Sequence, residues 1–187
     1  MLLERLQVRH QIHKIPEATI ATAGGDVARV TGVVRASTPL LTSLLAGRPC
    51  VAYRTRLASS GGRGRGRQRR PVDQSESVAV IRFAIDRAVD DYAIVEGSHA
   101  LFDASDLDLP RDNGAREEHV RLLFGQTGSV TTRREVTIEV GATVTVVGRA
   151  MFDMQADRGE HGFRDAPTPQ LRLVGDYANP LLISQHD

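Results

Sequence analysis

The sequence predicts a mainly β fold of the α+β class: an antiparallel, β-barrel-like domain preceded by one N-terminal helix. Two observations predict it. After Pro16 the chain consists of short runs rich in valine and isoleucine, which alternate in part between apolar and polar residues. Glycine, proline, aspartate and serine separate these runs, as in turns between strands. Eight or so short strands in one small domain indicate a closed or nearly closed barrel or a sandwich.

The first segment, residues 1–16, is expected to be an amphipathic helix. Apolar residues recur there with a partial period of 3.6, at Leu2, Leu3, Leu6 and Ile12. Pro16 ends the pattern, and the segment lacks the apolar stretch and small-residue cleavage site of a signal peptide. Residues 17–187 are then expected to form a single β domain.

The expected strands run from residue 26 to residue 184. They are 26–37, 50–58, 77–86, 92–97, 136–140, 143–152, 171–175 and 181–184. Gly141 lies where two of them must turn sharply, because glycine enters positive φ without a steric penalty. One or two short helices are expected besides, over 39–47 and over 113–126, where a charged first turn precedes an apolar run.

Strand 50–58 must place alternate side chains on opposite faces. We expect Cys50 or Val51 to be buried on one face, and Arg54 and Arg56 to be exposed on the other. Because no candidate base lies beside Cys50 in sequence, its thiol is interpreted as a small buried hydrophobic group.

The stretch GGRGRGRQRR at 61–70 joins two runs that would pair as a hairpin, so we expect it to be a long charged loop. Its five arginines are Arg63, Arg65, Arg67, Arg69 and Arg70. Such a cluster also suits a single-stranded nucleic acid, although the chain is only 4% aromatic and offers few stacking platforms. A third interpretation pairs the loop with the acidic segment 86–118 of the same or a neighbouring molecule.

The composition of the chain argues against several classes of protein function. The net charge is +1, from 24 basic and 23 acidic residues, which argues against a dedicated polyanion binder at the level of the whole chain. The single cysteine excludes an internal disulfide and a cysteine-based zinc cluster. No run of 18 apolar residues occurs, so no transmembrane segment is expected, and the chain is expected to be cytoplasmic or peripheral to a membrane.

The search for catalytic and metal-binding chemistry predicts none. The six histidines have no spacing that would set two ligands on one helical face, and no nucleophile elbow or phosphate loop is present. His10 and His13 are interpreted as a surface pair. Asp103, Asp106 and Asp108 lack the glycine and glutamate of a calcium loop and are interpreted as a solvated acidic turn. No enzyme, cofactor or metal is therefore expected.

Residues 30–57 carry a recognisable string, VTGVVRASTPLLTSLLAGRPCVAYRTRL. It holds a Gly-x-Val element, a proline and leucine that lead to Ser-Leu and Gly-x-Pro-Cys-Val, and then an aromatic residue and an arginine. The matching residues are Gly32, Pro39, Leu40, Ser43, Leu44, Gly47, Pro49, Cys50, Val51, Tyr53 and Arg54, and Leu45 departs from the pattern. The string resembles the signature of the GIDE, or "beside a membrane" (BAM), domain of the mitochondrial E3 ubiquitin ligases called MULAN or MAPL and of bacterial relatives. The segment 134–150 with Gly148, and the closing residues 179–187, resemble later parts of the same domain.

The resemblance implies a non-catalytic protein-interaction or assembly domain beside a membrane. Ubiquitin transfer in the eukaryotic ligases belongs to a separate RING module of paired cysteines and histidines, which a single cysteine cannot build. The family domain normally lies between two transmembrane helices, so membrane proximity and self-association are also expected. The alternative is an OB-like domain that binds single-stranded nucleic acid through the 61–70 arginines.

Overall fold

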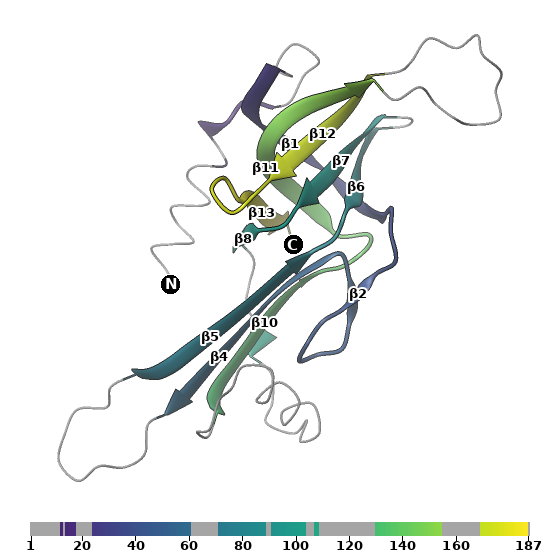
Figure 1. The fold of residues 1–187 in the computed structure, drawn as a ribbon. Helices are drawn as coiled ribbons and strands as arrows, with labels where there is room; N and C mark the ends of the chain where they lie inside the picture. Colours follow the sequence, from purple (N-terminus) through teal and green to yellow (C-terminus); the bar gives the residue numbers. More distant parts are fainter. Residues whose placement is uncertain are drawn as a thin grey trace.

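A computed structural model describes residues 12, 14–17, 24–60, 71–88, 91–103, 107–108, 130–154 and 169–186. Within these ranges the chain is mainly β, as the sequence predicts, with thirteen strands numbered in chain order (Figure 1). Ile12 and Lys14 are the described helical residues of the expected N-terminal helix. Ile12 and Ile15 pack against Val147 and Leu182, so the described part of this segment lies on the barrel wall.

Five strands close a barrel in the upper half of Figure 1. In the order in which they pair, these strands are β1 (Gly24–Ala36), β6 (Phe83–Ala88), β7 (Asp91–Gly97), β12 (Pro169–Gly175) and β11 (Thr143–Met154). The pairing of β11 with β1 closes the ring. Each of these pairs is antiparallel except β7 with β12, which is parallel.

This connectivity defines the class of barrel. Numbered along the chain, the five barrel strands follow one another around the ring as 1-2-3-5-4-1, with the parallel pair between the third and the fifth. That order is the strand order of the OB fold, a five-stranded Greek-key barrel. The barrel-like fold predicted from sequence is thus confirmed. Two further strands, β13 (Leu181–His186) and β8 (Ala100–Asp103), extend the sheet, since β13 pairs with β11 and β8 pairs with β13.

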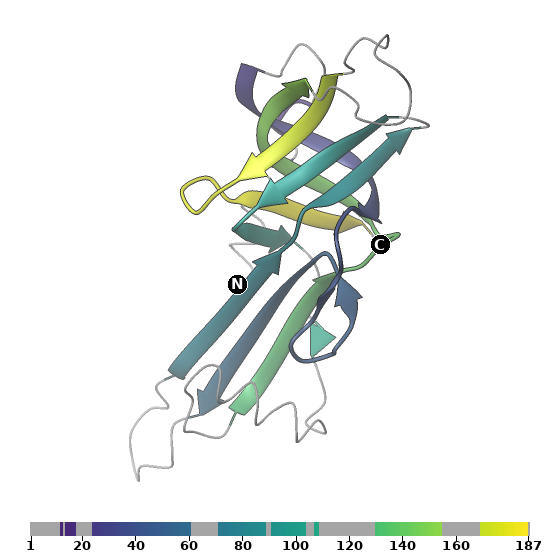
Figure 2. The same cartoon turned by 45° about the vertical axis from the view of Figure 1, so that its right-hand side comes forward.

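A second sheet projects from the barrel as an arm, visible at the lower left of Figure 1 and in the turned view of Figure 2. It consists, in pairing order, of β5 (Pro71–Val80), β4 (Ala52–Ser60), β10 (Val130–Ile138) and β9 (Leu107–Asp108). A short hairpin of β2 (Leu41–Thr42) and β3 (Pro49–Cys50) lies beside the base of the arm.

One hydrophobic core connects the barrel with the base of the arm. Barrel residues such as Phe83, Val95 and Leu173 belong to the same cluster of buried side chains as Val51 and Ile138 next to the arm. Two backbone hydrogen bonds seal the junction, from the Val51 amide to the Ile138 carbonyl and from the Ile81 amide to the Val51 carbonyl, both at 2.9 Å. Because the core is shared, the arm and the barrel are expected to unfold together.

The expected strand 77–86 is two strands. In β5 the side chains that pack on the core belong to even-numbered residues, Val78 and Val80. In β6 they belong to odd-numbered residues, Phe83 and Ile85. The alternation therefore changes parity at 81–82, where the chain leaves the arm and enters the barrel. The hairpin expected around the arginine loop is confirmed, because β4 and β5 are antiparallel and Ser60 faces Pro71.

The prediction for Arg54 and Arg56 is wrong. Arg54 is 5% exposed, and its guanidinium lies 5.8 Å from the centre of the Phe102 ring and donates to the Phe102 carbonyl. Arg56 is half-buried and pairs with Glu76 at 3.2 Å. The face of β4 that sequence alternation assigned to solvent is covered by residues distant in sequence. Phe102 lies over Arg54 and accepts its hydrogen bond, and Glu76 on β5 lies opposite Arg56 and pairs with it. Burial of Cys50 or Val51 was expected on one face only, and the structure buries both of these neighbouring residues fully.

The short helix expected over 39–47 is the β2–β3 hairpin, in which one helix-type hydrogen bond runs from the Gly47 amide to the Ser43 carbonyl. Asp103 is buried on β8 and accepts a hydrogen bond from the Ser184 hydroxyl, so it does not lie in a solvated turn. Gly141 has the expected positive φ, +88°, although its two flanking strands enter different sheets. The expected helix 113–126 and the arginine loop 61–70 lie outside the described residues. No described helix is long and apolar enough to cross a membrane.

Candidate functional site

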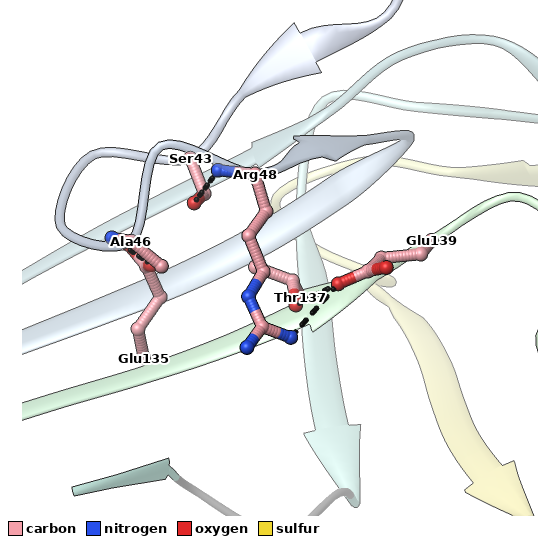
Figure 3. A network of polar contacts seen from close by, with 6 residues as sticks. All are labelled: Ser43, Ala46, Arg48, Glu135, Thr137 and Glu139. Atoms are coloured by element: carbon pink, nitrogen blue, oxygen red, sulfur yellow. Dashed lines mark hydrogen bonds and ion pairs between the residues drawn. The ribbon is translucent and has the colours of Figure 1, made fainter. Parts of the chain in front are cut away.

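The β2–β3 hairpin carries most of the motif on which the family resemblance rests. The Ser43 amide donates to the Arg48 carbonyl at 2.9 Å, and the Arg48 amide donates back to the Ser43 hydroxyl at 3.0 Å (Figure 3). Gly47 has a φ of +67°, which other residues rarely adopt. These contacts fix the turn from Ser43 to Arg48 in one conformation.

A buried carboxylate holds this hairpin against the arm. Glu135 on β10 is 2% exposed, and its two oxygens accept hydrogen bonds at 2.8 Å from the amides of Leu45 and Ala46. Figure 3 shows Glu135 beside Ala46. The Thr55 hydroxyl donates a third hydrogen bond at 2.8 Å. Hydrogen bonds to a charged acceptor are stronger than neutral ones, and here they satisfy backbone amides that the turn cannot satisfy itself. Glu135 is therefore a structural anchor of the hairpin.

Cys50 lies at the end of this hairpin. Burial, with smaller contributions from the carboxylates of Glu135 and Glu139, raises the pKa of the Cys50 thiol from 9.0 to about 11. At neutral pH the thiol is protonated, and the nucleophilic thiolate form is suppressed. The described surroundings of Cys50 thus match a packed thiol, as predicted, and give it no means of activation.

The residues singled out by the family motif fall into two structural groups. Gly32 and Gly148 are positions of close approach, because a Cβ atom there would lie 2.2 Å from the Asp86 carbonyl oxygen and 2.8 Å from a Leu181 methyl group. The others lie in or beside the hairpin, where Pro39 and Pro49 are exposed and Tyr53 is buried. The motif therefore builds the junction between barrel and arm, and it places no cluster of reactive groups there.

A second polar region lies on the outside of the barrel, over β6, β7 and β12. Alternation turns Ala84 and Ile94 outward, opposite each other, yet they are only 2% and 5% exposed. Arginines flank them, since Arg35 pairs with Ala84 across β1–β6, and Arg172 pairs with Ile94 across β7–β12. We call this surface the barrel face. Because Ala84 and Ile94 are buried although they point outward, neighbouring side chains must cover them, and the long side chains of Arg35 and Arg172 lie next to them in the sheet.

Ion pairs balance most of the arginines of the barrel face. Arg35 lies 3.0 Å from Asp86 and also stacks over the Tyr92 ring at 4.9 Å. Arg172 forms an ion pair with Glu96 across the parallel β7–β12 pair. Arg149, at the edge of the face, lies 3.9 Å from Asp176. The face therefore presents alternating charges of both signs.

One end of the barrel face is hollowed into an open pocket of about 570 Å³. Its lining includes Arg82, Glu96, Ser98, Met151 and Arg172. Gly97 and Gly175, which face each other on β7 and β12, also line it. A Cβ atom on Gly175 would lie 2.6 Å from Leu181, so glycine there lets Leu181 close the core directly beneath the pocket.

Arg82 differs from the other arginines of this surface. It is half-buried, and among the described residues its side chain makes no ion pair or hydrogen bond. Its backbone is held firmly, because its carbonyl accepts hydrogen bonds from the hydroxyls of Ser37 at 3.0 Å and Thr38 at 2.8 Å. Arg82 thus lines the pocket from a fixed backbone, and its cationic side chain has no partner among the described residues.

Exposed aromatic surface adjoins the pocket. Tyr177 is 83% exposed on the loop after β12, and its ring lies 5.0 Å from the His99 ring. Asp176 fixes this loop by accepting the Asn179 amide at 2.7 Å, and the amide of Ser98 binds the Gly175 carbonyl at 3.3 Å. A tyrosine held in solvent by a rigid turn is typical of binding surfaces.

Sequence reasoning missed both regions. Glu135 occupies an alternate position in the strand REVTI, where a charged residue indicates a solvent-facing side chain. Glu96 and Arg172 each follow the alternation of their own strands. The pairing of β7 with β12, which brings the two side chains together, could not be predicted from the sequence. The arginines predicted as an interaction loop, at 61–70, lie outside the described residues.

The fold and the barrel face together define a β-barrel of OB topology with a pocketed outer surface. Comparison of the chain with protein-family models, with curated proteins and with solved structures gives no match. Among the described residues no group of three or more His, Cys, Asp or Glu side chains could hold a metal ion.

Proposed function

We propose that this chain is a non-catalytic protein-binding module, of the GIDE type that its sequence resembles, and that a segment of the partner binds on the barrel face. One observation carries the proposal. The barrel face ends in an open pocket of about 570 Å³, whose lining combines the charged side chains of Arg82, Glu96 and Arg172 with exposed apolar surface at Met151. OB barrels bind oligonucleotides and oligosaccharides over this same surface, the second and third barrel strands, so the analogy of fold supports a binding role for the surface, and the kind of ligand must be argued from its charges.

The charges of the barrel face favour a protein segment over a polyanion. Arg35, Arg149 and Arg172 each have an acidic partner. A nucleic acid would have to compete with these carboxylates and would be repelled by them. A protein segment, by contrast, brings apolar groups for Met151 and Val174 in the pocket and charges of both signs for the ion-paired surface around it.

The resemblance supplies the expected setting. It implies a bacterial protein in the cytoplasm or at a membrane periphery, with a protein partner or a second copy of the chain beside the bilayer.

A peptide library displayed on phage tests the proposal. Peptides selected on the wild-type chain are expected to lose binding to Met151→Asp, because Met151 is 46% exposed and lines the pocket. Val140→Asp is the matched control, since Val140 is 49% exposed on the turn before β11, outside the pocket lining. Selection of no peptide, or equal loss with both variants, would contradict the proposal.

A second candidate is binding of single-stranded nucleic acid, and the OB strand order favours it. In the sequence the arginine stretch 61–70 connects β4 to β5, which are paired with each other from Ser60 and Pro71 onward. Fluorescence anisotropy with labelled oligonucleotides tests it. We expect weak binding at low salt that disappears near physiological salt. The reason is that each phosphate contact lowers log K by about 0.7 for every tenfold increase in salt concentration. Submicromolar, salt-resistant binding that is lost on deletion of 61–70 would favour the nucleic-acid function instead.

A further inference from the structure

We infer that the pocket of the barrel face is a carboxylate-binding subsite, which takes the side chain of an aspartate or glutamate in the partner segment. The inference rests on the proposed function for the origin of that carboxylate. Arg82 is the residue assigned to bind it, with Arg172 beside it. Arg172 is held in place by Glu96.

The charge of the pocket lining selects the ligand. Arg82 and Arg172 contribute two positive charges and Glu96 one negative charge, which leaves a formal charge of +1. Glu96 is paired with Arg172, so the unmatched charge belongs to Arg82. One carboxylate neutralises it, whereas a phosphate dianion would bring an excess negative charge close to Glu96.

The geometry suits a planar anion. Arginine presents its N–H groups in a fixed fork that matches the two oxygens of a carboxylate. The Ser37 and Thr38 hydroxyls hold the Arg82 carbonyl, and Phe83, the next residue, is fully buried in the core. The backbone of Arg82 is therefore already ordered before the ligand binds, which reduces the entropic cost of binding.

The rest of the lining matches the remainder of an acidic side chain. Met151 and Val174 provide apolar surface for its methylene groups. The exposed Ser98 hydroxyl is an additional donor at the pocket wall. A glutamate side chain would thus find donors for its carboxylate and apolar contacts for its stem.

Nuclear magnetic resonance of the whole chain tests the inference without any partner protein. The probes are blocked glutamate (N-acetyl-glutamate methylamide), the matching blocked glutamine, and inorganic phosphate. We expect blocked glutamate to shift the Arg82 Nε–H signal and the amides of Gly97 and Ser98, with millimolar affinity. Blocked glutamine should leave them unchanged, and phosphate should bind more weakly than blocked glutamate.

Variants assign the effect to Arg82. Arg82→Gln should weaken binding of blocked glutamate about tenfold or more, because it removes a charged hydrogen-bond donor. Arg82→Lys should retain part of the binding, since it keeps the charge without the fork. Arg48→Gln, on the hairpin, is the control and should bind normally. The dispersion of the amide spectrum shows whether each variant is folded.

Three results would overturn the inference: tighter binding of phosphate, equal shifts with blocked glutamine, or unchanged binding in folded Arg82→Gln. Failure of the proposed function looks different. In that case blocked glutamate binds at Arg82 as expected, while the phage library gives no peptide that depends on Met151.

Discussion

Glu135 and Arg82 are both charged, but they differ in burial and in the number of partners that their side chains have. Glu135 is 2% exposed and accepts three hydrogen bonds, from two backbone amides and the Thr55 hydroxyl. Arg82 is half-buried, lines an open pocket, and makes no side-chain ion pair with any described residue. The carboxylate joins two pieces of the chain, whereas the guanidinium faces a space that a ligand can enter.

This difference distinguishes a charged residue that stabilises the fold from one that is available to bind a ligand. A buried charge whose hydrogen bonds are complete contributes to the fold, and removing it leaves its donors unsatisfied. A partly exposed charge without a partner contributes little to the fold and retains its capacity for an external ligand. Loss of stability should therefore follow substitutions at the hairpin, and loss of binding should follow substitutions at the pocket.

The largest effect is expected at Glu135. Glu135→Ala leaves two amides and the Thr55 hydroxyl without an acceptor in a buried site, which should lower the free energy of unfolding by about 3 to 5 kcal/mol. Chemical denaturation measures it. Glu139→Ala is the matched control, because Glu139 is half exposed and its ion pair with Arg48 should be worth less than about 1 kcal/mol. Equal losses of unfolding free energy in the two variants would contradict the assignment of Glu135 as the structural anchor of the hairpin.

A pH effect is expected at Cys50, whose pKa is raised from 9.0 to about 11 in the folded chain. Between these two values the unfolded chain has lost the thiol proton and the folded chain still holds it, so stability must fall as pH rises. The loss is at most about 3 kcal/mol. Cys50→Ala removes this contribution, and the stability advantage of the wild type over Cys50→Ala should shrink from about pH 9 to about pH 11. Parallel pH curves from urea denaturation would contradict the assignment.

A smaller effect is expected at Gly175, beneath the pocket. A Cβ atom there would lie 2.6 Å from Leu181, so Gly175→Ala should cost about 1 to 3 kcal/mol through overpacking. Leu181→Ala in the same chain removes the side-chain atoms at 2.6 and 3.1 Å but leaves the Leu181 backbone nitrogen at 2.7 Å, so it should relieve the clash in part. The two costs should therefore not add, with a coupling above about 0.5 kcal/mol. Additive costs in thermal or chemical unfolding would show that the two residues do not share this contact.

The smallest effect is expected on the surface of the hairpin. Arg48→Gln breaks one exposed ion pair with Glu139 at 3.2 Å and should change the free energy of unfolding by less than about 0.5 kcal/mol. A loss above about 2 kcal/mol would show that the hairpin depends on this pair as well as on Glu135.

The strands were predictable from sequence because alternation and turn residues are local properties. The partners of those strands were not, and the outcome at particular residues shows why. Arg54 was assigned to a solvent face, yet Glu76 and Phe102, both distant in sequence, bury it. Glu135 is buried because the hairpin at 41–50 covers its face of the arm, and no local pattern around β10 contains that information.

The candidate site was less predictable than the fold. Arg82 and Arg172 are far apart in the chain and line one pocket only because β6, β7 and β12 are neighbours in the barrel. Pairing order of this kind depends on long-range contacts, which single-sequence periodicity does not encode. The arginine-rich stretch 61–70 attracted attention because its composition is unusual, whereas the arginines of the barrel face are spaced as in any amphipathic strand.

The most direct test measures stability and binding together on one substitution, Arg82→Gln. The free energy of unfolding should stay within about 0.5 kcal/mol of the wild type, because the described side chain contacts no partner that it would leave unsatisfied. Binding of blocked glutamate should fall about tenfold or more in the same protein. A loss of stability above about 2 kcal/mol with unchanged binding would contradict the account, since Arg82 would then be part of the scaffold.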